Sequence, residues 1–114
     1  MSSYELFFYK TSSNREIVLE FINSSPYIEL TKIHNDLDLL GELGLKLLVT
    51  PLVKKIYSNP RIYELRVKSR REIRLLFSFY RPNRIVFLHG FIKKTNKTPI
   101  KELRIAIKRS KEFI

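Results

Sequence analysis

From residue 62 onward, apolar and polar side chains alternate, and this period of two residues constrains the fold more than any other feature. Alternating runs cover residues 62–68 and 73–80, a third run covers residues 85–92, and short polar turns separate the three. Such alternation is typical of β-strands, and short turns join strands that lie antiparallel. The third run is apolar at nearly every position, which predicts a central strand that is buried on both faces. We therefore expect an antiparallel meander.

Two helices are expected before the meander. Ser13 and Glu16 have the spacing of a capping box, which predicts that the first helix starts there. Pro26 predicts the start of the second helix, and Gly41 and Gly44 are candidate stops. The second helix has an apolar seam with intervals of three and four residues, formed by Leu30, Ile33, Leu37 and Leu40. This seam spans fewer than two heptads, which favours packing on the sheet of the same domain over a coiled-coil partner.

The remaining segments complete an α+β domain. Residues 4–9 are rich in aromatic side chains and predict a short strand. Residues 45–60 contain two prolines and are expected to be mostly loop. Thr98-Pro99 predicts the start of a final helix that covers about residues 100–112. The expected element order is β-α-α-β-β-β-α, in one domain that comprises residues 1–114.

The positive charge of the chain is concentrated in the half that contains the meander. The net charge is +11, but residues 1–60 contribute −1 and residues 61–114 contribute +12. An asymmetric field of this kind suggests a polyanionic partner, most often nucleic acid. A generally lysine-rich composition is the alternative, and it explains the total better than the asymmetry.

Several kinds of site are disfavoured by what the sequence lacks. There is no cysteine, so disulfides and thiolate zinc sites are excluded. His34 and His89 are the only histidines, and they are too far apart in sequence to suggest a metal site, so we expect neither metal nor cofactor. No apolar run approaches the roughly 20 residues of a membrane span, and the polar N-terminus is unlike a secretory leader. The expected location is the cytoplasm, without membrane contact.

Basic side chains are expected to converge on one face of the meander. Arg66 and Arg74 lie on neighbouring predicted strands, opposite the apolar stripe, and Lys93 and Lys94 end the next strand. A sheet face with cations for phosphates and aromatic rings for bases is a plausible platform for single-stranded RNA, although it could also be an ordinary solvated face. The candidate RNA-binding residues beside these four are Lys68, Lys97, Tyr80 and Phe91.

The motifs of other enzyme classes are absent, including phosphate-binding glycine loops and H-E-x-x-H. The basic face also lacks paired carboxylates, which disfavours a metal-dependent nuclease. Metal-free RNA cleavage remains, in which the 2′-OH attacks its own phosphate with the help of a base, an acid and cations. A lysine can serve as the base if burial and neighbouring cations lower its pKa. His89 shares alternation parity with Phe87 and Phe91, so we expect it in the core.

Three stretches carry a resemblance to a known family: Tyr63–Val67 with its Glu-Leu-Arg, Ile73–Phe77 with its Arg, and Leu88–Pro99 with Phe-x-Lys-Lys-Thr-x-Lys-Thr-Pro. Together with Glu102 and Ala106 of the last helix, they resemble the phage-derived HigB-like branch of the RelE/ParE toxin superfamily. The resemblance spans nearly the whole chain. It implies a RelE-like fold, with a curved antiparallel sheet, an N-terminal helix pair on one face and a C-terminal helix.

The resemblance also implies an activity, that of a type II toxin and metal-independent endoribonuclease that cleaves mRNA in the ribosomal A site. The implied catalytic residues are Arg66, Arg74, Lys93 and Lys94. Many relatives have a Tyr or His near the C-terminal end, but this chain ends Lys-Glu-Phe-Ile, so the acid and the base stay unassigned. The implied partner is a cognate helix-turn-helix antitoxin, through which alone the toxin would reach operator DNA.

Two other functions remain open. Members of the superfamily related to ParE inhibit DNA gyrase, and a basic domain can also be a non-catalytic RNA- or ribosome-binding module. The basic side chains on the sheet face favour RNA over a gyrase-docking surface.

Overall fold

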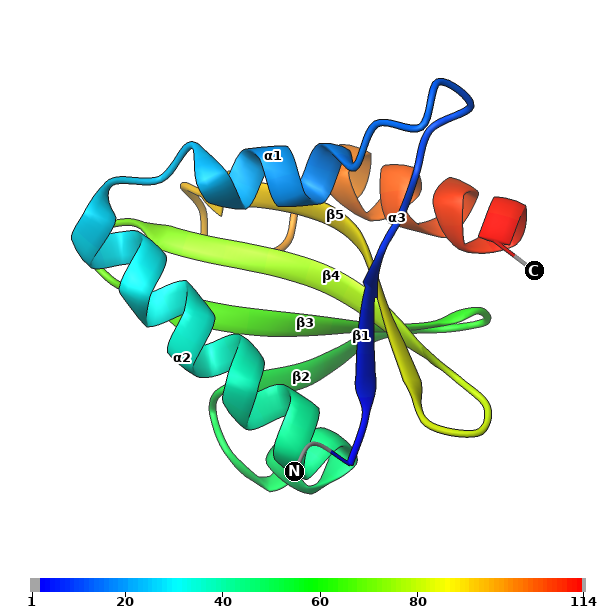
Figure 1. Cartoon of the computed structure of the whole chain (residues 1–114), viewed down its shortest axis with the longest axis horizontal. Helices are drawn as coiled ribbons and strands as arrows, with labels where there is room; N and C mark the ends of the chain where they lie inside the picture. The colour runs from blue at the N-terminus through cyan, green and yellow to red at the C-terminus, as the bar shows by residue number, and fades with distance from the viewer. Residues whose placement is uncertain (1–2, 114) are drawn as a thin grey trace.

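A five-stranded sheet with helices on both faces forms the protein (Figure 1). The computed structural model describes residues 3–113, without the side chain of Phe113. No helix in this range is long and apolar enough to cross a membrane. The elements in chain order are β1 (Glu5–Phe8), α1 (Ile17–Asn23), α2 (Tyr27–Leu43), the 3₁₀-helix η1 (Gly44–Val49), β2 (Val53–Ser58), β3 (Arg61–Lys68), β4 (Glu72–Tyr80), β5 (Arg84–Lys93) and α3 (Ile100–Phe113).

The strand order is β1-β5-β4-β3-β2, which confirms the α+β class and is consistent with a RelE-like fold. Strands β2 to β5 form an antiparallel meander, and β1 pairs with β5 in parallel. In the β3–β4 ladder, Arg66 is directly opposite Arg74. Opposite residues of a ladder point to the same face, so the register places both arginines on one side of the sheet.

The prediction that residues 45–60 are mostly loop is wrong, because this segment contains η1 and β2. Pro51 and Pro60 flank β2 and do not interrupt it. As an edge strand, β2 pairs only with β3, and the register shifts between Lys55 and Tyr57. Most of its side chains are exposed or half-buried, which removes the clean alternation by which a strand is recognised.

Helices α1 and α2 cover one face of the sheet, and the main core lies between these helices and the sheet (Figure 1). The predicted seam of α2 is confirmed at Ile33, Leu37 and Leu40, which are buried. They meet the apolar stripe of the meander, to which β3 contributes Tyr63, Leu65 and Val67. At about 25 cal/mol per Å², burial of these large side chains is the main force that stabilises the layer.

The predicted helix starts are partly wrong. Helix α1 begins at Ile17 without a side-chain cap, and the Ser13 hydroxyl lies 3.0 Å from the Thr11 hydroxyl instead. The capping box fails because residues 11–15 close a turn of their own, in which Asn14 has φ +64°. Helix α2 does follow Pro26, and it continues through the expected stop at Gly41.

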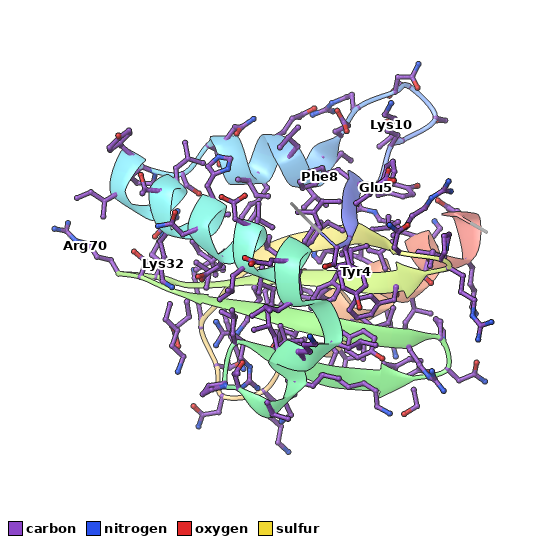
Figure 2. All side chains as sticks on the ribbon, turned by 60° about the horizontal axis from the view of Figure 1, so that its bottom comes forward. Tyr4, Glu5, Phe8, Lys10, Lys32 and Arg70 are labelled. Atoms are coloured by element: carbon purple, nitrogen blue, oxygen red, sulfur yellow. The ribbon has the colours of Figure 1, made fainter. Side chains whose placement is uncertain are left out.

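Gly44 ends α2 with φ +52°. A Cβ atom at this position would lie 2.2 Å from the ring of Tyr4, which sits close to the end of α2 (Figure 2). Both the backbone conformation and the close approach of the ring require glycine here.

Helix α3 packs on the opposite face of the sheet, against β5 and β4, and it is seen behind α1 and β1 in Figure 1. A smaller core fills this interface and comprises Ile62, Leu76, Val86, Leu88, Phe91 and Ala106. The face that carries Arg66 and Arg74 is therefore covered over much of its area. What stays open is the end of the sheet near the turn between β3 and β4, where the segment 94–99 leads into α3.

A bulge in β5 decides which residues share the face of the arginines. Opposite β4, Phe77 pairs with Phe87 but Leu76 pairs with His89, so Leu88 is an extra residue. The alternation reverses at this point. Phe87 belongs to the main core, whereas His89 lies on the other face, and the predicted parity that joined them is wrong.

Beyond the bulge, Phe91 pairs with Arg74 and Lys93 pairs with Glu72. Uninterrupted alternation from Phe87 would have placed Lys93 on the face of the main core. The bulge therefore brings Lys93 to the face of Arg66 and Arg74.

Candidate functional site

Two adjoining hollows, of about 360 and 390 Å³, lie on the sheet face that carries Arg66 and Arg74, which we call the second face, at the end that α3 leaves open. They share three lining residues, Arg66, Lys93 and Asn96, and we call the two hollows together the basic groove. The first hollow is also lined by Lys68, Glu72, Arg74, Lys94 and Thr95. The second is also lined by Lys54, Lys55, Ile56, Lys97, Thr98 and Leu103.

The structure brings together most of the residues that the sequence singled out. All four candidate catalytic residues and Lys68 line the first hollow, and Lys97 lines the second. Their proximity depends on the meander for Arg66 and Arg74 and on the bulge for Lys93. Sequence reasoning missed Lys54 and Lys55, because they lie on β2, in the segment that was expected to be loop.

Glu64 lies beneath the groove and is fully buried. Its Oε1 atom accepts a hydrogen bond from Nε of Arg66 at 3.1 Å and lies 3.5 Å from Nε of Arg74. The alternation of β3 places Glu64 on the same face as Arg66, but it gives no sign of this burial. A buried carboxylate needs compensating partners, and the two guanidinium groups provide them.

The two arginines differ in how far they reach the groove. The side chain of Arg66 is 26% exposed, so it can contact a ligand directly. The side chain of Arg74 is only 5% exposed, and its Nη1 donates to the carbonyl oxygen of Ile73 at 3.1 Å. Its Nε atom makes no hydrogen bond to the described residues. Arg74 thus acts on the groove mainly through its charge.

Lys93 lies half-buried where the two hollows meet. Burial lowers the pKa of its ammonium group, and the charges of Arg74, Arg66 and Lys54 lower it further, whereas Glu64 opposes them. A lowered pKa increases the fraction of the neutral amine near neutral pH. Lys93 therefore has the environment of a lysine that can accept a proton.

Thr98 connects the segment 94–99 to the sheet. Its hydroxyl donates to Oε2 of Glu64 at 2.6 Å, while the backbone carbonyl of Pro99 accepts the amides of Glu102 and Leu103. The predicted start of α3 is confirmed, because the helix begins directly after Pro99. The Thr98 hydroxyl is directed to the buried carboxylate, and it fixes one end of the segment 94–99, which we call the basic segment.

Residues 20–111 match the model of the family described as phage-derived protein Gp49-like (DUF891). The chain belongs to this family. The Gp49-like family is toxin-like, of the RelE/HigB type. No curated protein matches the chain significantly. The matched segment contains every residue of the basic groove, so the groove belongs to the part of the chain that defines the family.

The two aromatic residues expected to stack on bases lie elsewhere in this Gp49-like protein. Phe91 is 6% exposed and packs in the smaller core beneath α3, so it has no ring face free for a base. Tyr80 is half-buried at the far end of β4 from Arg74, and its hydroxyl is 3.3 Å from that of Ser110. Neither ring lines the basic groove, because α3 covers this part of the sheet face.

His89 is held between β5 and α3. Its Nε2 atom is 2.9 Å from Oε1 of Glu102, and its ring stacks on that of Phe91. Burial lowers the pKa of the His89 imidazole, and the hydrogen bond and charge of Glu102 offset only part of this decrease. His89 does not line either hollow, so in the Gp49-like protein its contacts are those of a packing residue.

No group of three or more potential metal ligands occurs among residues 3–113. Glu72 is the one acidic side chain among the described residues that line the two hollows. Apart from this carboxylate, the chemistry available in the groove is that of amines, guanidinium groups, hydroxyls and amides. Such groups bind phosphates and transfer protons.

Proposed function

We propose that this Gp49-like protein is a HigB-like type II toxin that cleaves mRNA on the ribosome. The observation that carries the proposal is the position of Lys93, half-buried among cations in an open basic groove, with a lowered pKa. The family match supports the toxin class, and the groove supplies the features that RNA cleavage needs.

The groove favours RNA as the ligand. Lysines and arginines line the two hollows, and such a surface binds the phosphates of a single strand. Ile56 and Leu103 add an apolar wall in the second hollow, against which a base can pack. Only RNA provides the 2′-OH that the proposed reaction uses as its nucleophile.

In the proposed reaction, the neutral amine of Lys93 accepts the proton of the 2′-OH. The 2′-oxygen then forms a bond to the adjacent phosphorus while the bond from phosphorus to the 5′-oxygen breaks. The products are a 2′,3′-cyclic phosphate and a 5′-OH end, the latter protonated by solvent or a neighbouring lysine. The charge that develops on the phosphoryl oxygens is stabilised by direct contact with Arg66 and by the field of Arg74.

The proposal includes an acidic partner. As the toxin of a type II pair, the protein would be held inactive by a cognate antitoxin with a helix-turn-helix domain. The strongly basic groove favours a partner segment rich in Asp and Glu, because opposite charges speed association and stabilise the complex. Operator DNA would be bound by the antitoxin and reach the toxin only through it.

Inducible expression of the wild type and of Lys93→Arg tests the proposal. Arginine keeps the positive charge but is not deprotonated in proteins, so it cannot act as the base. Wild type should arrest translation and cleave mRNA, and Lys93→Arg should lose about 100-fold or more in cleavage rate on purified ribosomes. Lys10→Arg, which lies outside both hollows, is the matched control.

The outcomes separate the rival functions. Arrest of DNA replication with intact mRNA would contradict the proposal and favour a gyrase inhibitor. Ribosome binding without cleavage would favour a non-catalytic module. If Lys93→Arg cleaved as fast as the wild type, the assignment of Lys93 would be wrong even if the class were right.

A further inference from the structure

Glu64 is a carboxylate without exposure to solvent, placed inside a cationic site, and the proposed reaction gives it no direct role. Its partners come from three different parts of the chain: Arg66 from β3, Arg74 from β4 and Thr98 from the segment before α3. Burying a carboxylate is unfavourable unless such partners offset the loss of its hydration. An apolar residue here would avoid that cost, so the buried charge calls for an explanation in terms of the site.

Each partner of Glu64 also lines the basic groove. Arg66 lines both hollows, Arg74 lines the first and Thr98 lines the second. We propose that Glu64 is a positioning residue, whose buried carboxylate holds Arg66, Arg74 and the Thr98 end of the basic segment in one arrangement around Lys93. Strands β3 and β4 and the segment before α3 are thereby held by one carboxylate.

The charge of Glu64 also acts on Lys93. The charged groups that face Lys93 or pair with it across the sheet are Glu64 and Arg66 of β3, Arg74 and Glu72 of β4, and Lys54 of β2. Among those that influence the Lys93 pKa, the three cations lower it and Glu64 raises it. Glu64 therefore limits how far the pKa falls. The catalytic consequence of this balance rests on the proposed function, whereas the arrangement of side chains does not.

The first test is an NMR titration of the Lys93 side chain in the full chain. Glu64→Gln keeps the shape of the side chain and removes its charge, so the Lys93 pKa should fall. Glu42→Gln makes the same change on the exposed side of α2 and should leave the Lys93 pKa as it is in the wild type. A folded Glu64→Gln protein with an unchanged Lys93 pKa would overturn the proposal.

Cleavage kinetics give the second measurement. Because misplaced charges lose transition-state contacts, Glu64→Gln should lower kcat by about tenfold or more. The midpoint of its pH–rate profile should also move to lower pH, which a merely structural defect would not cause. If the wild type failed to cleave RNA, the proposed function would fail, but the titration of Lys93 would still decide the role of Glu64.

Thr98→Val provides a test that does not depend on the folding of Glu64→Gln. Valine matches the shape of threonine but cannot donate to Glu64, so the amides of residues 94–98 should exchange with solvent faster. Binding of a 2′-O-methyl RNA, which cannot be cleaved, should also weaken. Thr31→Val on α2 is the matched control. Unchanged amide exchange and RNA binding in Thr98→Val would show that Glu64 does not anchor this segment.

Discussion

Lys93 illustrates how neighbouring residues give a common side chain an unusual chemistry. Lysine is ordinarily protonated up to a pKa of about 10.4. In this protein, burial and three cations favour the neutral amine, and Glu64 moderates their influence. The sequence shows that Lys93 lies at the end of a strand, but it does not show these neighbours, which come from β2, β3 and β4.

The pH dependence of cleavage follows from the same neighbours. In the proposed reaction the neutral amine of Lys93 is the active form, so the rate should rise with pH through the lowered pKa of Lys93 and then level off. Lys54→Gln removes one of the cations that lower this pKa, so the Lys93 pKa should rise and the profile should move to higher pH. This direction is opposite to that expected for Glu64→Gln.

Measurements of the cleavage rate at a series of pH values check this prediction, with Lys46→Gln of η1 as the control for the loss of one lysine. A profile that stayed in place in Lys54→Gln, or moved to lower pH, would contradict the role of Lys54. A rate that fell as pH rose through the Lys93 pKa would contradict Lys93 as the base.

At the scale of elements, the meander could be predicted because one face of each strand is apolar, which imposes a period of two. The edge strand β2 could not, because most of its side chains are solvated and no period results. The bulge at Leu88 left no signal either, because β5 is apolar on both faces before it, and an extra apolar residue does not disturb such a pattern. The parity of His89 and the placement of Lys93 depended on that bulge.

The end of α2 lies at Gly44, one of the two candidate stops that the sequence predicted. Gly44 has φ +52°, and the ring of Tyr4 occupies the space where a side chain would begin. Gly44→Ala should therefore lower the free energy of unfolding by about 2 kcal/mol or more, through backbone strain and displacement of the ring. Urea denaturation measures this as a lower midpoint. Glu42→Ala, at an exposed helical position, should change stability by only a few tenths of a kcal/mol. Equal midpoints for the two variants would rule out the strain.

At the scale of the whole molecule, the charge asymmetry of the sequence becomes a spatial one. The basic groove draws residues from β2, β3, β4, β5, the segment 94–99 and α3, so all but β2 come from the basic half of the chain. The second face was expected to be an open platform, but α3 covers much of it. The apolar contacts of α3 involve Tyr80 and Phe91, so these rings lie outside the groove. The sequence therefore predicted which cations gather in the groove, but not where these two rings lie.

The placement of the cations predicts how RNA binding depends on salt. Each phosphate that a cation neutralises on a single strand adds about −0.7 to the slope of log K against log salt. Lys97→Gln, at the rim of the second hollow, should therefore make this slope shallower by about that amount. Lys10 lies on the loop after β1, on the opposite side of the molecule from Arg70 of the β3–β4 turn (Figure 2), so Lys10→Gln should leave the slope unchanged. Fluorescence anisotropy of a labelled 2′-O-methyl RNA between roughly 50 and 200 mM salt measures both slopes. A flat salt response of the wild type, or equal losses in the two variants, would show that the groove does not bind the RNA.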